Sequence, residues 1–194
     1  MKQQIPNTTW GLEVDTVSRW AYAEGLFTNE ECDQIIKLGY EYELTKSVTI
    51  GASSEYRDSR SVFLEPNPDT SWIYKRLTDA VMELNSKFFN FDLFGFNEGL
   101  QFTEYTAPGG KYNPHIDKLY LKSIRKLSIT VQLTDPNEYE GGDFEILDEV
   151  PGEKLTRTRG TLLAFPSYTL HAVTPVTKGT RNSLVSWISG KPFR

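Results

Sequence analysis

The feature that most constrains the fold is a change in sequence pattern near residue 97. From that point the chain is a series of short β-type segments separated by Gly, Pro and Asp, namely LQFTEY, KLSITVQL, DFEIL, GTLLAFP, HAVTPV and RNSLVSWIS. Short segments rich in β-branched and aromatic residues, with frequent turn signals, are typical of antiparallel sheets that fold onto each other. The second half of the chain is therefore predicted to form a β-sandwich or barrel.

The first half carries helical patterns instead. Segment 26–44 predicts a helix that begins after Thr28, because Glu31 completes a capping box and apolar residues then recur at helical spacing. Segment 69–89 predicts a second helix, and segment 48–64, rich in Gly, Ser and charged residues, predicts a loop that enters a strand. Helices followed by strands indicate an α+β, mainly β protein with N-terminal supporting helices.

Composition excludes several classes of function. The chain has 194 residues, of which 38% are hydrophobic, which suffices for one core, so we predict a single domain over 1–194. A net charge of −5 without any Lys/Arg-rich run argues against nucleic acid or a membrane surface as partner. The lone Cys32 cannot form an internal disulfide, and we expect it to be a buried thiol on the first helix. No stretch approaches the roughly 18 apolar residues that cross a bilayer. We expect a cytoplasmic protein, and its oligomeric state stays open.

The two histidines of the chain indicate a metal site. If residues 115–117 are extended, the side chains of His115 and Asp117 lie on the same side of the strand. A sheet that folds back could bring His171 to them, although it lies 56 positions later. Two imidazoles and one carboxylate leave about three positions of a metal open, as in non-haem Fe(II) enzymes.

Other interpretations of these histidines are weaker. A lone histidine is more often a hydrogen-bonded structural residue than a ligand, and an H-x-D string alone has little specificity. A Ser-His-Asp or Cys-His catalytic site lacks support, because no G-x-S-x-G elbow occurs and Cys32 lies in a helix. A structural zinc site would require four ligands, mostly Cys and His.

A second constellation follows ten residues after His171, in GTRNSLVSWISG. Arg181 and Ser183 share one face of the expected strand by its two-residue period. An R-x-S pair on a strand is more often a surface pair. A buried guanidinium, however, requires an anion, and a ligand carboxylate satisfies it through paired hydrogen bonds. Because Arg181 and Ser183 follow His115, Asp117 and His171 in the sequence, we interpret the pair as an anchor for the carboxylate of a cosubstrate.

Taken together, these motifs resemble the 2-oxoglutarate and Fe(II)-dependent dioxygenases, in particular the prolyl 4-hydroxylase-like branch and its bacterial PKHD-type relatives. The resemblance runs through FTNEECDQIIKLG, LQFTEYTAPGGKYNPHIDK, RKLSITVQLTDPNEYEGGDFEI and GTLLAFPSYTLHAVTPVTKGTRNSLVSWISG. It implies a double-stranded β-helix, a jelly-roll of two sheets with the metal at one open end. It also implies Fe(II), 2-oxoglutarate and O2 as cofactors and cosubstrates, with ascorbate as a further candidate.

Residue by residue, the resemblance makes His115, Asp117 and His171 the iron ligands, and it assigns the far carboxylate of 2-oxoglutarate to Arg181. Further contacts to the cosubstrate are expected from Tyr105, Ser183, Thr130 and Gln132, of which Gln132 stands where some relatives place a second tyrosine. Substrate contacts are expected from Tyr112, Tyr120, Trp187, Arg57 and Arg60. The two arginines could equally pair with surface carboxylates.

The activity that the resemblance implies is hydroxylation of a C–H bond, with succinate and CO2 as coproducts. A prolyl residue of a peptide or protein is the expected substrate, since the aromatic side chains could flank a pyrrolidine ring. A free amino acid or another small metabolite is the alternative, and a non-catalytic binding or sensor protein on the same fold is a third hypothesis. Loops 50–60 and 118–126 are either lids over the substrate or ordinary solvated connections.

Overall fold

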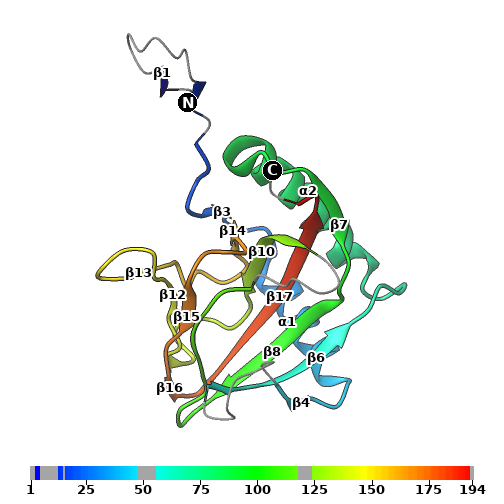
Figure 1. The fold of residues 1–194 in the computed structure, drawn as a ribbon. Coiled ribbons are helices and arrows are strands. Elements are labelled where there is room, and N and C mark those ends of the chain that lie inside the picture. Colours follow the sequence, from blue (N-terminus) through cyan, green and yellow to red (C-terminus); the bar gives the residue numbers. More distant parts are fainter. Residues whose placement is uncertain (1–2, 5–12, 15, 48–55, 118–123, 193–194) are drawn as a thin grey trace.

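Two antiparallel sheets face each other in the computed structural model (Figure 1). The structure describes residues 3–4, 13–14, 16–47, 56–117 and 124–192. In order, the eight-stranded sheet contains β3 (Ala21–Ala23), β14 (Leu162–Pro166), β10 (Arg125–Gln132), β17 (Thr180–Gly190), β8 (Leu100–Thr106), β6 (Arg60–Leu64) and β4 (Thr45–Lys46), with β7 (Leu93–Phe96) paired to β17. The five-stranded sheet contains β13 (Glu153–Lys154), β12 (Phe144–Ile146), β15 (His171–Val173), β9 (Lys111–His115) and β5 (Arg57–Asp58). Two small sheets pair β1 (Gln3–Gln4) with β2 (Glu13–Val14) and β11 (Glu140–Gly141) with β16 (Val176–Lys178).

Two helices precede most of the strands. Helix α1 (Asn29–Tyr40) begins with the predicted capping box: the Glu31 N–H donates to the Thr28 hydroxyl at 3.2 Å, and the Thr28 N–H donates to the Glu31 carboxylate at 2.9 Å. Helix α2 (Ser71–Leu84) continues into a π-helical turn, η1 (Asn85–Phe89). Both predicted helices are therefore confirmed, and Cys32 is fully buried on α1 as expected.

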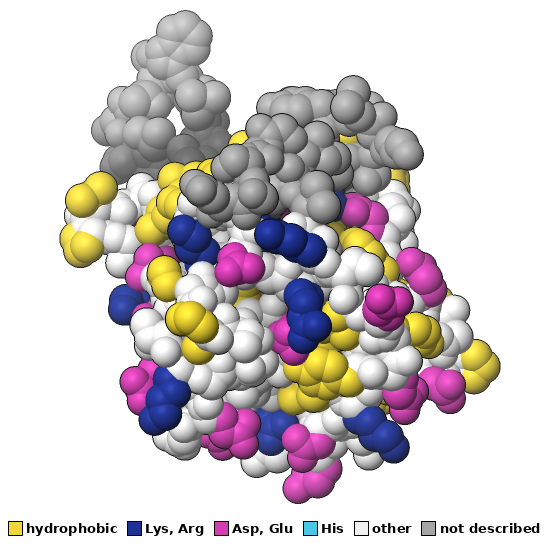
Figure 2. Space-filling view, turned by 90° about the horizontal axis from the view of Figure 1, so that it is seen from below, with side chains coloured by type: hydrophobic (Ala, Val, Ile, Leu, Met, Phe, Trp, Pro, Cys, Tyr) yellow, Lys and Arg dark blue, Asp and Glu magenta, His cyan; other side chains and the backbone are white. Residues whose placement is uncertain are grey.

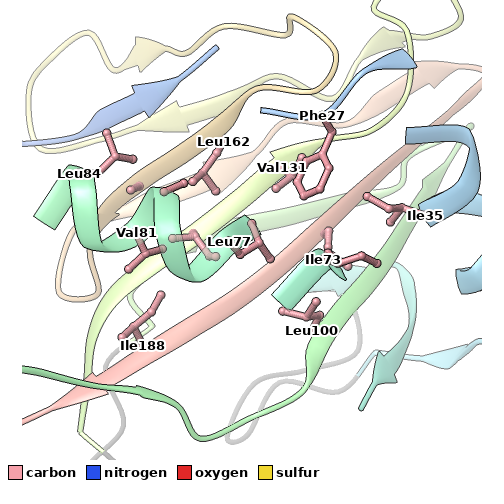
Figure 3. Close-up of a cluster of buried hydrophobic side chains, with 14 of the residues drawn as sticks. Phe27, Ile35, Ile73, Leu77, Val81, Leu84, Leu100, Val131, Leu162 and Ile188 are labelled. Atoms are coloured by element: carbon pink, nitrogen blue, oxygen red, sulfur yellow. The ribbon is translucent and has the colours of Figure 1, made fainter. Parts of the chain in front are cut away.

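The helices cover the outer face of the eight-stranded sheet. Apolar side chains of α1 and α2 form one core with side chains of β8, β10, β14 and β17 (Figure 3). Strand β10 shows how this arrangement shapes the opposite face: Leu127 and Val131 join the core under the helices, while Ser128 and Thr130 alternate with them and are equally buried. The sheet therefore presents a buried polar surface to the second sheet.

Strand assignments in the first half differ from the sequence-based expectation. The strand expected at the end of segment 48–64 is present as β6 (Arg60–Leu64), but Arg57–Asp58, expected in the loop, already forms β5 because it pairs with β9 of the second half. The expected strand HAVTPV is divided into β15 and β16, which belong to different sheets. Whether these segments form strands depends on partner strands far away in the chain. Local sequence patterns carry no information about such partners.

Both proposed lid loops fall mainly outside the described residues. This holds for residues 50–55 and 118–123, including Tyr120, whereas residues 125–126 begin β10 rather than a loop. Among the described residues, no helix is long and apolar enough to cross a membrane. On the face shown in Figure 2, Lys and Arg side chains are interspersed with Asp and Glu, so neither sign of charge forms a continuous surface there. The single domain over 1–194 and the cytoplasmic location stay predictions.

Candidate active site

A cavity of about 520 Å³ lies between the two sheets. It is lined by strands β8, β10 and β17 of the large sheet and by β5, β9 and β15 of the small one. The sequence-predicted residues that line it are Arg57, Tyr105, Tyr112, His115, Asp117, Thr130, His171, Arg181, Ser183 and Trp187. Residues from six strands are thus brought into one space, of the size that small ligands occupy.

Three potential metal ligands meet on the small-sheet side of this cavity. His115 ends β9 and His171 begins β15, and the two residues are direct partners in the antiparallel ladder. Asp117 follows two residues after His115, with its carboxylate 3.8 Å from the His115 Nε2 and 3.5 Å from the His171 Nε2. The three ligand atoms all lie within 4.8 Å of one another. The H-x-D segment and the distal histidine therefore form one cluster, as the sequence pattern indicated.

Both imidazoles are oriented by their own backbone. The Nδ1 atom of His115 lies 2.8 Å from the Asn113 carbonyl oxygen, and the Nδ1 atom of His171 lies 2.9 Å from the Thr169 carbonyl oxygen. A carbonyl oxygen only accepts hydrogen bonds, so each Nδ1 carries the proton and each Nε2 presents a lone pair to the cluster. This is the tautomer that a metal bound through Nε2 requires.

Charge in the cluster also favours metal binding. Burial lowers the pKa of His115 to about 4, the neighbouring His171 adds to this effect, and Asp117 only partly opposes it. Burial alone would raise the pKa of Asp117, but the nearby His171 and then His115 outweigh it and, with the polar groups of Trp187 and Ser128, lower it below its ordinary value. Near neutral pH the cluster holds a neutral His115 and an ionised carboxylate, which are ligand forms that a divalent cation needs.

A β-bulge shapes strand β9 beside the cluster. His171 pairs with His115, but Val173, two residues on, pairs with Tyr112, three residues back, so β9 holds one extra residue. In a regular strand, residues three apart would point to opposite faces. The bulge returns Tyr112 to the face of His115, where the two rings stack with centroids 3.4 Å apart.

Arg181 on β17 is the second notable group of the cavity. Its side chain is 1% exposed, donates to the Gln132 side-chain oxygen at 2.8 Å and lies 3.4 Å from the Ser183 hydroxyl. Its Nε–H has no hydrogen-bond partner, and the guanidinium forms no ion pair with any described carboxylate. A buried cation without a counter-charge is costly, so the site requires an anionic ligand.

The other residues expected near the cosubstrate fall into two groups. Tyr105, Thr130 and Ser183 line the cavity, and the Tyr105 ring lies 5.5 Å from the guanidinium carbon of Arg181. Gln132 does not line it: its side chain donates to the Thr156 carbonyl oxygen at 3.0 Å and accepts from Arg181. Gln132 therefore holds the Arg181 guanidinium in place from outside the cavity.

Of the residues expected at the substrate, Tyr112 and Trp187 line the cavity and Arg57 joins them from β5. Arg60 lies elsewhere: it pairs with Glu104 at 2.7 Å outside the cavity, and its side chain is 59% exposed. This is the surface-pair alternative that the sequence left open. Tyr120 lies outside the described residues.

Sequence reasoning missed Arg125, which lines the cavity at the start of β10. Its guanidinium stacks on the Trp187 ring at 3.6 Å and donates to both carboxylate oxygens of Glu98, at 2.7 and 2.5 Å. It also donates to the Asp117 carbonyl oxygen at 3.3 Å. Because Glu98 and Trp187 lie far from Arg125 in the chain, no local pattern announced this contact.

A jelly-roll of two sheets that encloses a His-Asp-His cluster and an arginine without an ion-pair partner among the described residues is typical of non-haem iron oxygenases that use a 2-oxo acid. Residues 100–189 match the model of the 2OG-Fe(II) oxygenase superfamily. This match covers just under half of the chain and is a similarity to the superfamily, whose Fe(II) and 2-oxoglutarate would fit the His115, Asp117 and His171 donor set and the buried Arg181. The match supports the resemblance found in the sequence, and the mainly β fold is confirmed.

Similar proteins match over part of their length. A PKHD-type hydroxylase of Prochlorococcus marinus is 40% identical over 91 residues, which are 46% of this chain and 41% of that protein. A PKHD-type hydroxylase of Klebsiella pneumoniae is 33% identical over 125 residues, which are 60% of this chain and 55% of that protein. The chain thus spans between about two fifths and just over half of the length of these curated relatives.

Solved structures share the fold. A prolyl-4-hydroxylase of Pseudomonas putida matches with a TM-score of 0.71 and 18% identity, over 90% of this chain and 94% of that one. A prolyl hydroxylase of Trichoplax adhaerens, in complex with a peptide fragment of the hypoxia inducible factor, matches with a TM-score of 0.74 and 15% identity, over 89% of this chain and 84% of that one. At these identities the likeness concerns the fold.

Proposed function

We propose that the protein is a 2-oxoglutarate- and Fe(II)-dependent dioxygenase that hydroxylates a C–H bond of a prolyl residue in a peptide or protein, with succinate and CO2 as coproducts. The observation that carries the proposal is the joint presence, in one cavity, of the His115–Asp117–His171 cluster and a buried Arg181 that has no described carboxylate partner. The first provides for a metal, and the second for the far carboxylate of a dicarboxylic acid.

In this mechanism, His115, Asp117 and His171 would hold the iron at the cavity wall. When bound, Fe(II) would supply the chemistry for C–H hydroxylation, with O2 as the oxidant and 2-oxoglutarate as the reductant that yields succinate and CO2. The chain contributes binding and orientation: Arg181, fixed by Gln132, receives the carboxylate. Phe144 and Phe165 pack against the His171 ring, with centroids 5.5 and 4.6 Å away, and would keep water from that side of the ligand cluster.

The prolyl part of the proposal rests on the aromatic surface beside the cluster and on analogy. Tyr112 stacks on His115, and Trp187 lies under the Arg125 guanidinium, so both rings are held rigidly at the cavity wall. Flat, fixed rings of this kind suit the apolar faces of a pyrrolidine ring. The Pseudomonas and Trichoplax proteins carry the name prolyl hydroxylase, and the second was solved with a peptide.

The test is a comparison of intact protein with His171→Ala in the presence of Fe(II), 2-oxoglutarate and proline-containing peptides. Intact protein should form succinate and a peptide product 16 Da heavier, and the variant should do neither, because two ligands hold the metal far more weakly than three. Equal succinate formation by both proteins would refute the cluster as the metal site. Succinate formation without oxidation of any peptide in a broad panel would refute the prolyl substrate alone.

A further inference from the structure

We propose that Arg57 binds a carboxylate group of the substrate, so that the preferred substrate is an acid. The inference rests on the proposed function, which it deepens by naming a chemical group that the substrate carries. It starts from a second buried arginine in the same cavity, which the binding of iron and 2-oxoglutarate leaves without use.

Arg57 lies on the edge strand β5, where it pairs with Tyr112 of β9. Its side chain is 8% exposed, and its guanidinium carbon lies 4.6 Å from the centre of the Tyr112 ring. The Nε–H donates to the Ser59 hydroxyl at 2.7 Å, and Nη2 donates to the Gln101 side-chain oxygen at 3.1 Å. Contacts with Tyr112 of the small sheet, Gln101 of the large sheet and Ser59 between β5 and β6 therefore hold a rigid guanidinium at the cavity wall.

None of these contacts neutralises the charge. Hydroxyl and amide groups accept hydrogen bonds but carry no negative charge, and Arg57 forms no ion pair with a carboxylate among the residues described. Among the described residues, its Nη1 atom also has no hydrogen-bond partner. The position is therefore a preformed site for an anion, with a donor still available.

Once iron and 2-oxoglutarate are bound, the charge of Arg57 has no negative partner in the site. Fe(II) brings two positive charges, which Asp117 and one carboxylate of 2-oxoglutarate balance, and the other carboxylate of 2-oxoglutarate balances Arg181. Arg125 is already paired with Glu98. Arg57 alone, among the arginines of the cavity wall, then keeps an uncompensated positive charge, which a carboxylate on the substrate would balance.

Place in the fold separates Arg57 from the cosubstrate anchor. Arg181 projects from the large sheet, whereas Arg57 lies at the edge of the small sheet, next to the Tyr112 ring that stacks on His115. A carboxylate held by Arg57 would keep the adjoining part of the substrate beside Tyr112 and the metal cluster. Substrate selection and cosubstrate binding are in this way assigned to different arginines.

The experiment measures binding to protein loaded with Zn(II) and 2-oxoglutarate, in which no turnover occurs. Two matched probe pairs differ in the carboxylate: N-acetyl-L-proline against N-acetyl-L-prolinamide, and a short capped peptide with Glu next to Pro against the same peptide with Gln. Wild-type protein should bind the acid of at least one pair about 10- to 100-fold more tightly than its neutral partner, the range of one charge-assisted hydrogen bond. The pair that shows the preference tells whether the carboxylate belongs to a small acid or to a peptide.

Three variants complete the test. Arg57→Gln should reduce the preference to less than about threefold, and Arg57→Lys should restore part of it, because lysine returns the charge without the planar fork. Lys111→Gln, which removes a positive charge from β9 outside the cavity, should retain the wild-type preference. The affinity for 2-oxoglutarate should change less than twofold in Arg57→Gln.

The proposal is overturned if neither acid is preferred by wild-type protein, or if Arg57→Gln retains the preference. It is also overturned if Arg57→Gln weakens 2-oxoglutarate binding, since Arg57 would then be a second cosubstrate residue. Succinate formation, measured separately with Fe(II), reports on the proposed function. A preference that depends on Arg57 in a protein that makes no succinate would support the acid site while refuting the enzyme.

Discussion

Replacing Arg181 by Met should separate cosubstrate binding from protein stability. In the free protein the guanidinium is 1% exposed and satisfied only by Gln132 and, at 3.4 Å, by Ser183. Met removes a desolvated charge, which is favourable, but leaves the Gln132 oxygen without its donor, which costs about 1–3 kcal/mol. Because these effects oppose each other, we expect the free energy of unfolding to change by less than about 2 kcal/mol.

Binding of 2-oxoglutarate should respond strongly to the same change. The Nε–H of Arg181 has no partner and one Nη1 contact is long, so two donors are available for a carboxylate. At about 1.5–3 kcal/mol for each hydrogen bond to a charged group, their loss amounts to roughly 3–6 kcal/mol. The dissociation constant should therefore rise by about 10²- to 10⁴-fold.

The assay is isothermal titration calorimetry on Zn(II)-loaded protein, with denaturant unfolding of the metal-free protein beside it. The control ligand is 2-oxobutyrate, which has the keto acid group but lacks the far carboxylate, and its affinity should be the same in both proteins. If Arg181→Met binds 2-oxoglutarate as tightly as wild type, or loses 2-oxobutyrate equally, the assignment of this arginine is wrong.

Two further variants test local features. Hydrogen bonding from Arg76, and then from the Thr28 backbone, lowers the pKa of Glu31, so the ionised form adds stability above its unfolded pKa that is lost as the pH falls through the lower folded value. Glu31→Gln should therefore cost about 0.5–1 kcal/mol at pH 7 in chemical denaturation, and a gap that persists well below pH 4 would contradict the ion pair. In Gly142→Ala, at a φ of +64°, the new Cβ would lie 2.9 Å from Val176 and 3.1 Å from the Arg181 side chain. We expect a loss of about 1–3 kcal/mol in unfolding and weaker 2-oxoglutarate binding with unchanged Zn(II) affinity, whereas a parallel loss of Zn(II) would point to general disruption.

Sequence patterns predicted the elements whose signals are local. The capping box of Thr28 and Glu31, and the shared face of Arg181 and Ser183, each depend on residues within a few positions, and both are present as expected. Motif order then linked His115 to His171, because a set of spaced motifs carries far more information than a dipeptide.

Features that depend on distant partners could not be predicted. Arg125 receives its role from Glu98 and Trp187, which lie in other strands, and Arg57 becomes rigid through Gln101 of the opposite sheet. Arg60 carries the same side chain three residues after Arg57 but pairs with Glu104 outside the cavity. Strand pairing, and not residue type, places Arg57 in the cavity and Arg60 outside it. Pairing is a property of the whole fold.

The bulge in β9 gives the site a property comparable to a reading frame. Tyr112 and His115 share a face only because one residue is left over in the ladder between them, so their cooperation is encoded in the number of residues as much as in their identity. Point substitutions along β9 leave that count intact. A single insertion or deletion there would turn the ring away from the imidazole while every functional residue was still present, so the spacing of this strand should be inherited more strictly than its composition.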